Sequence, residues 1–163
     1  MGNSFTLFLT EKKFDTLKYL NGKVVAECDY EVEEINPSIY EMYDGFIYKN
    51  PQEEEKLKGT CLSAEEMYLY LQDKTGYAIH IKSLKIFDEP KELSDYSKRI
   101  KNDFQVLGTA PQNMMKCVSL FTTPILDYVL ISIQPQWLFK ILNGEKTIEV
   151  RKKVLKEMLW KAS

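Results

Sequence analysis

The stretch that most constrains the fold is residues 130–153, LISIQPQWLFKILNGEKTIEVRKK. Its apolar start predicts a strand. Pro135 then opens an amphipathic segment that stops at Gly144, and proline in the first turn with glycine past the end is typical of a helix. The residues after Gly144 alternate between apolar and polar, which predicts a second strand. One polar face of that strand is formed by Thr147, Glu149 and Arg151.

Lys146 lies at the turn that enters this second strand. A lysine, a carboxylate and a guanidinium therefore come within a few residues of one another. Such a set can hold a phosphate or a polar base edge, or supply a base and an electrostatic stabiliser. The alternative is an outward strand face that carries only a Glu–Arg pair.

The rest of the chain predicts a mixed α+β domain over residues 1–163. Strands are predicted over 5–10, 23–35, 77–87, 116–121 and 128–133. Short helices are predicted over 63–76, where Ser63 and Glu66 form a capping box, and over the tail 153–162. Residues 11–22 are predicted to form either a short helix or a structured loop. Residues 36–60 have no period and predict a surface excursion, and the DEPKEL segment after Phe87 predicts a strand stop. Six or so strands with a few short helices predict a small, closed β-barrel.

Charge and apolar content limit the function classes. The formal charge of −2 argues against an indiscriminate nucleic-acid binder. The distribution is uneven, with 12 acidic and 3 basic residues over 27–66 and 7 basic and 3 acidic residues over 140–161, which leaves a local anion site open. No apolar run is long enough to span a membrane and no secretory signal is present, so we expect a cytoplasmic protein. The widely spaced Cys28, Cys61 and Cys117 predict buried, reduced thiols.

The same stretch resembles the opening segment of ASCH-domain proteins, in the PUA-like β-barrel superfamily. The shared form is Ser-Ile-x-Pro-x-aromatic, then Ile-Leu-x-Gly-x-Lys-Thr-Ile-Glu-x-Arg-Lys. The segments LNGKVVAECDYEVEEI, CLSAEEMYLYLQDKTGYAIHIKSLKIFDEPKELSDY and APQNMMKCV are similar to later segments of a phage and prophage-borne branch. Together these segments cover about three-quarters of the chain.

The order of these segments differs from that of the family. The opening unit of the family comes last in this chain, and the segment that follows it in the family resembles FTLFLTEKKF near residue 5. The resemblance therefore implies a circular permutation of a PUA-like barrel, natural or engineered, which surface termini make tolerable. A monomer and a domain-swapped dimer are both compatible with a unit at the chain end.

The resemblance implies a nucleotide or RNA segment in a cleft beside the opening unit. Some ASCH proteins are amidohydrolases on acetylated cytidine, and some are reported as ribonucleases. Lys146 matches the lysine of the amidohydrolase turn, but Glu149 occupies the position of that branch's threonine nucleophile. The phage branch also carries an Arg and a Trp where this chain has Ala110 and Met114 or Met115, while its glutamine matches Gln112.

Three functions follow as hypotheses. The first is a phage-type accessory protein that binds RNA or a nucleotide. The second is a hydrolase on RNA or a modified nucleoside at the same site, with Glu149 as base and Lys146 as stabiliser. The third is an inhibitor that binds a host defence or regulatory protein through the acidic segment 27–66.

We expect no cofactor and no metal, and we interpret the lone His80 as structural or exposed. The predicted ligand-binding residues are Ser132, Gln134, Lys146, Thr147, Glu149, Arg151 and Gln112.

Overall fold

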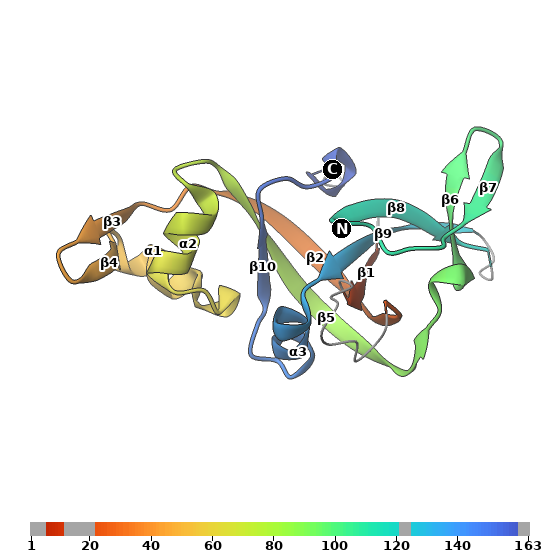
Figure 1. Ribbon diagram of the computed structural model, residues 1–163, viewed down its shortest axis with the longest axis horizontal. Coiled ribbons are helices and arrows are strands. Elements are labelled where there is room, and N and C mark those ends of the chain that lie inside the picture. The colour runs from red at the N-terminus through yellow and green to blue at the C-terminus, as the bar shows by residue number, and fades with distance from the viewer. Residues whose placement is uncertain (1–5, 12–21, 121–124, 160–163) are drawn as a thin grey trace.

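A curled, mostly antiparallel β-sheet forms the body of the protein (Figure 1). The computed structural model describes residues 6–11, 22–120 and 125–159. Within these residues, eight strands form one sheet in the order β10-β5-β2-β1-β9-β8-β6-β7. Among the strand pairs of the described residues, only β1–β9 is parallel. The strands are β1 (Thr6–Glu11), β2 (Val24–Ile35), β5 (Gly76–Lys91), β6 (Tyr96–Ile100), β7 (Asp103–Val106), β8 (Met114–Ser119), β9 (Leu126–Ile133) and β10 (Ile148–Arg151).

The predicted mixed α+β class is confirmed, but the predicted closed barrel is wrong for the described part of the chain. The strand order there is open, with β10 and β7 at its two ends. The sheet nevertheless curls enough for a side chain of β10 to reach β9, although three strands lie between them in the sheet order. Arg151 of β10 donates from Nη2 to the Ser132 carbonyl of β9 at 2.7 Å. A side chain therefore spans a gap that backbone pairing would close in a barrel.

Three α-helices and three 3-10 segments accompany the sheet in the described ranges. The helices are α1 (Pro51–Lys56), α2 (Ala64–Leu71) and α3 (Pro135–Leu142), and the 3-10 segments are η1 (Lys58–Thr60), η2 (Leu93–Asp95) and η3 (Lys156–Leu159). The capping box is confirmed, since the Ser63 hydroxyl accepts from the Glu66 amide and the Glu66 carboxylate from the Ser63 amide. Pro135 opens α3 as predicted, and Gly144 lies just past its end at φ +86°.

The long pair β2–β5 forms the spine of the sheet. The predicted strand over 23–35 is confirmed, and its alternation buries Ala26, Cys28 and Tyr30. Strand β5 continues to Lys91, past the predicted stop, because it follows the start of β2, with Val24 opposite Lys91. A register irregularity between Val24 and Ala26 lets the pairing continue across the proline before Lys91.

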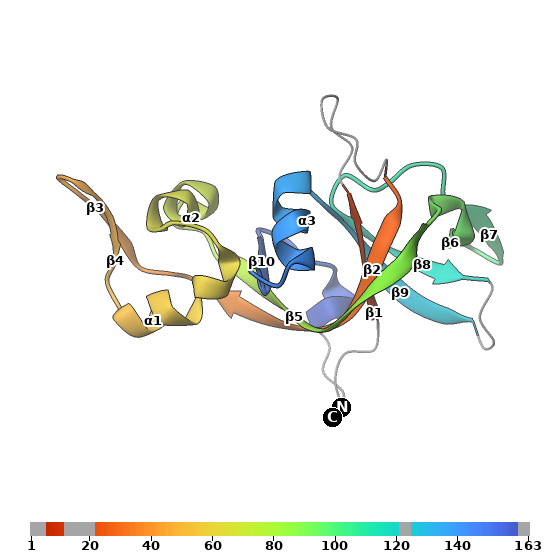
Figure 2. The same ribbon diagram turned by 90° about the horizontal axis from the view of Figure 1, so that it is seen from below.

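Segment 36–60 is largely exposed, as expected for the predicted surface excursion, but it has regular structure that was not predicted. It contains an antiparallel ribbon of β3 (Ile39–Met42) and β4 (Gly45–Tyr48), followed by α1 and η1. The polar segment 96–106, for which no strand was predicted, is the hairpin β6–β7. Ribbon and hairpin lie at opposite ends of the molecule (Figure 2). The predicted element over 11–22 falls almost wholly outside the described residues, and the predicted tail helix is the 3-10 segment η3 as far as the structure describes it.

Two hydrophobic clusters of the described chain position the site. In the first, Leu138 and Ile141 of α3 and Met158 of η3 pack on the strands β1, β2 and β9. In the second, Met67 and Leu71 of α2 and Leu57, just before η1, pack with Ile148 and Val150 of β10. A third cluster lies under β6 and β8. The first two clusters hold α3 and α2 on either side of β10, which leaves a space between the two helices. No helix in the described ranges has the length and apolar character needed to cross a bilayer.

Candidate functional site

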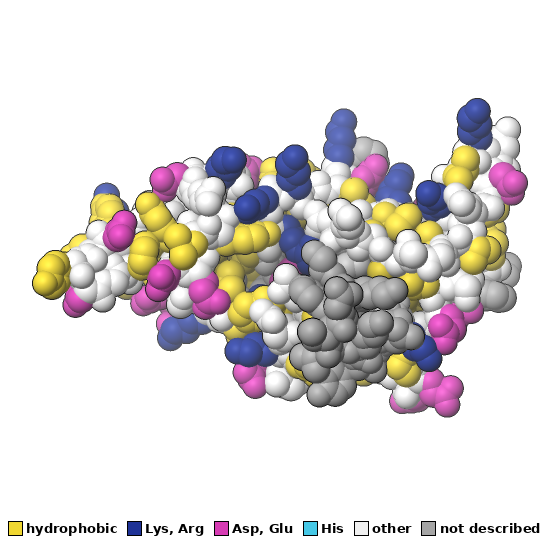
Figure 3. Space-filling model, viewed as in Figure 1, with side chains coloured by type: hydrophobic (Ala, Val, Ile, Leu, Met, Phe, Trp, Pro, Cys, Tyr) yellow, Lys and Arg dark blue, Asp and Glu magenta, His cyan; other side chains and the backbone are white. Residues whose placement is uncertain are grey.

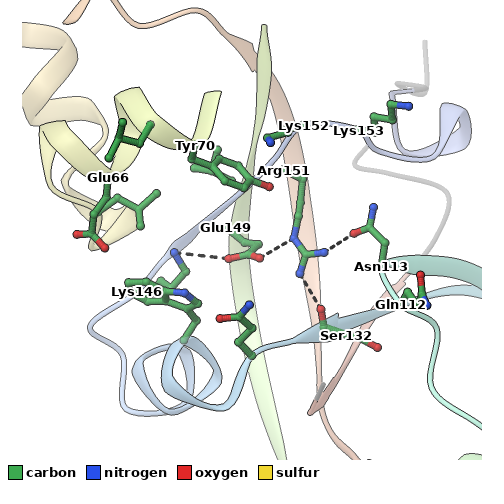
Figure 4. Close-up of a pocket in the computed structure, with 15 residues that line it drawn as sticks. Glu66, Tyr70, Gln112, Asn113, Ser132, Lys146, Glu149, Arg151, Lys152 and Lys153 are labelled. Carbon is green, nitrogen blue, oxygen red and sulfur yellow. Dashed lines mark hydrogen bonds and ion pairs between the residues drawn. The ribbon is translucent and has the colours of Figure 1, made fainter. Parts of the chain in front are cut away.

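A cavity of about 810 Å³ lies between α2, α3 and β10 (Figure 4). It combines cations, carboxylates, amides and aromatic rings. Its lining residues are Leu62, Glu66, Leu69, Tyr70, Gln112, Asn113, Ser132, Gln134, Trp137, Lys146, Glu149, Val150, Arg151, Lys152 and Lys153. A cavity of this volume is in the range of small-ligand sites.

Lys146 is buried in the wall of the cavity, with a relative exposure of 3%. Its Nζ donates to the Thr60 carbonyl at 2.5 Å, lies 3.5 Å from Glu149 Oε1, and stands 5.0 Å from the centre of the Trp137 ring. Burial lowers the pKa of Lys146, and the neighbouring Glu149 carboxylate offsets only part of that effect. The side chain is therefore held in place by three different elements around it.

Glu149 lies between two cations. Its Oε1 faces Lys146 and its Oε2 accepts from Arg151 Nε at 2.7 Å. The side chain is only 10% exposed, so both ion pairs are shielded from water. Both carboxylate oxygens of Glu149 therefore face a cation, which fixes the orientation of the group in the cavity wall.

Arg151 connects β10 to the opposite wall of the cavity. Besides Glu149, its guanidinium donates to the Asn113 side-chain carbonyl and to the Ser132 backbone carbonyl. These three acceptors come from β10, from the segment before β8 and from β9. A planar group with several fixed donors is suited to such a bridge.

The structure brings six of the seven predicted ligand-binding residues together around this cavity: Gln112, Ser132, Gln134, Lys146, Glu149 and Arg151. Thr147 does not line it. Strand β10 begins one residue later, and the Thr147 amide donates to the Gly59 carbonyl at 2.8 Å. A Cβ at Gly59 would overlap Thr147 Oγ1, so the threonine side chain lies against η1. His80 is also outside the cavity lining, and its Nε2 lies 3.1 Å from Glu33 Oε1.

Sequence reasoning missed the α2 wall of the cavity. Glu66, Leu69 and Tyr70 line it, while Met67 and Leu71 on the other side of α2 are buried in the second cluster. The spacing i, i+3, i+4 could have indicated that the three lie on one helix face. Burial raises the pKa of the Tyr70 hydroxyl.

Three more lining residues went unrecognised: Asn113, Lys152 and Lys153. Asn113 directly follows the predicted Gln112, and the two lysines directly follow Arg151. Trp137 was interpreted as a core or rim residue. It both packs against the first cluster and lines the cavity.

The cavity has the parts needed to bind a ligand with an anionic end and a flat polar end. Lys152 and Lys153 are exposed cations at its edge, and Lys152 Nζ lies 4.9 Å from the centre of the Tyr70 ring. Tyr70 and Trp137 offer ring surfaces, and the amides of Gln112, Asn113 and Gln134 offer donors and acceptors. Among the residues with described positions, no group of three or more His, Cys, Asp or Glu gathers as metal ligands would.

Comparison of the chain with protein-family models, with curated proteins and with solved structures finds no match.

Proposed function

We propose that this protein binds a nucleotide or a short RNA segment in the cavity between α2 and α3. The supporting observation is that exposed cations, two aromatic rings and three side-chain amides line a single cavity. Phosphates are held by Lys and Arg, bases stack on aromatic rings, and amides pair with base edges.

The contacts assign different roles to the cations. Lys146 and Arg151 are occupied by protein acceptors, so they hold Glu149 and the cavity walls in position. Lys152 and Lys153 are exposed, so they are free to meet a phosphate at the cavity edge. Glu149 then presents a buried acceptor to a base edge or a ribose hydroxyl.

We further propose that the chain is a permuted, ASCH-type member of the PUA-like superfamily. Two pairings support this. Strand β9 of the 130–153 unit pairs with β1, the strand that the unit would precede in the family order. Strand β10 of the same unit pairs with β5, the neighbour of β2. The unit therefore pairs directly with β1 and reaches β2 only through β5.

The test is calorimetric titration with nucleoside monophosphates and short single-stranded RNAs at low salt. Lys153→Ala and Tyr70→Leu alter cavity residues, whereas Lys98→Ala removes an exposed lysine of β6 and is the matched control. We expect Lys153→Ala to weaken binding about tenfold, because it removes a charge-assisted contact. Absence of binding at low salt, or equal affinities for Lys153→Ala and Lys98→Ala, would contradict the proposal.

A hydrolase acting on RNA or acetylcytidine is the second candidate function. It is favoured by one observation, a buried lysine of lowered pKa in contact with a carboxylate beside an open cavity. Incubation with both substrates, with Glu149→Gln as the comparison, tests it. Turnover that survives this substitution would reject Glu149 as the base.

A further inference from the structure

The inner face of the β3–β4 ribbon packs on the body of the protein. Phe46 lies 5.1 Å from the Tyr68 ring of α2, centre to centre, and Tyr48 is buried in the second cluster. An isolated two-stranded ribbon is marginally stable in water, so these contacts are what supports it. The outer face is then not required for the fold.

That outer face is apolar and uncovered by any described element. The register places Tyr40 opposite Ile47, and Met42 follows two residues along on the same side. These side chains are about half exposed, at 47%, 51% and 53%, and Tyr43 at the tip is fully exposed. Lys49 Nζ approaches the Tyr40 ring at 5.9 Å, which covers little of this surface. Tyr and Met are enriched at protein interfaces, whereas a solvated ribbon face is normally polar.

The tip of the ribbon and the cavity have complementary charge. Asp44 is the charged residue of the turn between β3 and β4, whereas Glu41 lies opposite Phe46 on the inner face and Lys49 follows β4 beside the Tyr40 ring. The cavity has four cations, Lys146, Arg151, Lys152 and Lys153, and two carboxylates, Glu66 and Glu149. Figure 3 shows hydrophobic and acidic side chains, with some Lys and Arg among them, over the end of the molecule that holds β3, β4 and α2, and Lys and Arg near the centre.

The order of these features along the molecule permits a twofold contact. The β3–β4 ribbon, α2 and β10 follow one another along the long axis (Figure 1), and residues of α2 and β10 line the cavity. Between ribbon and cavity, α2 presents Leu69, which is 55% exposed and lines the cavity. A twofold axis near α2 would place the ribbon of each copy at the cavity of the other, with Leu69 close to the axis.

We propose that two copies of this chain associate about such an axis, with the β3–β4 ribbon of each copy docked in the cavity of the other. Met42 and Tyr43 meet the apolar and aromatic lining, and Asp44 meets Lys153 at the edge. One ribbon alone offers less than the roughly 800 Å² per partner of a stable interface, and reciprocal docking together with the α2 contact enlarges the buried area. On the proposed function above, the dimer also closes the nucleotide site, so ligand and second copy compete.

Sedimentation velocity of the full chain, at concentrations up to ~100 μM and at low and high salt, tests the proposal. We expect a dimer that salt weakens, because charges contribute to the contact. Tyr43→Ser should weaken it about tenfold, as expected for an interface anchor. Val106→Ser removes an exposed apolar side chain of β7, at the opposite end of the molecule, and should not change it.

Charge exchange gives the sharper result. Asp44→Lys and Lys153→Asp should each weaken the dimer, and the two together should restore it, because the pair is then re-formed with reversed sign. A monomer at every concentration would overturn the proposal. The proposal would also be overturned if Tyr43→Ser left the dimer unchanged, or if the double variant did not recover dimer formation. Photo-crosslinks from position 43 that reach only another protein would overturn it too.

Nucleotide titrations separate the two proposals. A dimer that follows these expectations but binds no nucleotide sustains the docking and rejects the proposed function alone. If a nucleotide binds the dimer as tightly as it binds the Tyr43→Ser variant at a concentration where that variant is monomeric, the closure of the site by the ribbon is overturned.

Discussion

Replacing Glu149 with glutamine should destabilise the protein by about 3 kcal/mol. The side chains of Lys146, Glu149 and Arg151 are 2%, 10% and 14% exposed, so the substitution leaves two shielded cations without their shared carboxylate. Breaking a buried ion pair from one side costs about 3–5 kcal/mol, and a glutamine oxygen that still accepts from Arg151 keeps the loss near the lower end. For a chain of this length each kcal/mol lowers Tm by about 2–4 °C, so a fall of roughly 6–12 °C is expected.

Urea unfolding and calorimetry measure this loss, with Glu31→Gln as the matched control. Glu31 pairs with Lys82 at 3.2 Å, but the two side chains are 65% and 51% exposed. An exposed pair contributes little, so the control should lose no more than about 0.5 kcal/mol. If both variants lose the same free energy, the shielding of the Glu149 pairs by burial is refuted.

The pH dependence of the same variant gives an independent check. The pKa of Lys146 is already lowered by burial, and removing Glu149 removes the main influence that raises it. A lysine whose folded pKa lies below its unfolded value near 10.5 binds fewer protons in the folded state between those two values. The stability deficit of Glu149→Gln relative to the natural chain should therefore shrink as pH rises toward 10.5.

Three further outcomes follow from packing, thiol burial and hydrogen bonding. Gly59→Ala should lose about 1–3 kcal/mol in thermal melts, because a Cβ there overlaps the residue before β10. Gly108→Ala, with open space around it, should lose far less. Burial raises the pKa of Cys28 and of Cys117 from 9.0 to about 12, so the stability that each thiol contributes is lost as pH rises through this window, at up to about 1.4 kcal/mol per pH unit. Urea titrations above pH 9 should show a flatter decline when both are alanine. A lysine at position 151 cannot reach all three acceptors of Arg151 at once. Arg151→Lys should therefore lower Tm, and it should weaken nucleotide binding about tenfold as measured by calorimetric titration.

Local signals were enough to predict several elements. The alternation over 24–35, the capping box at Ser63 and the Pro135 and Gly144 limits of α3 each depend on neighbouring residues, and each was predicted. The ribbon over 39–48 was not predicted, because it depends on a contact with Tyr68, some twenty residues further along the chain. The extension of β5 to Lys91 was likewise not predicted. It depends on the pairing of β5 with β2, whose register has irregularities that no short sequence pattern specifies.

In the candidate site, too, the residues set by local sequence were predicted and those set by distant contacts were not. Lys146, Glu149 and Arg151 were named from one short stretch, and the structure places all three at the cavity. Thr147 was placed with them because a strand pattern was extended one residue too far, whereas its amide pairs with Gly59. Asn113 was missed because its role comes from Arg151, a partner 38 positions away.

The position of β1 has a consequence for how this chain folds. This short strand lies between β2, which follows it closely in sequence, and β9, which begins only at Leu126. Its second edge cannot be paired until more than a hundred further residues are available, and loop closure on that scale is slow. During synthesis the N-terminal strand would therefore expose one unpaired edge, and we expect refolding on the millisecond-to-second scale with β1–β9 pairing as a late step.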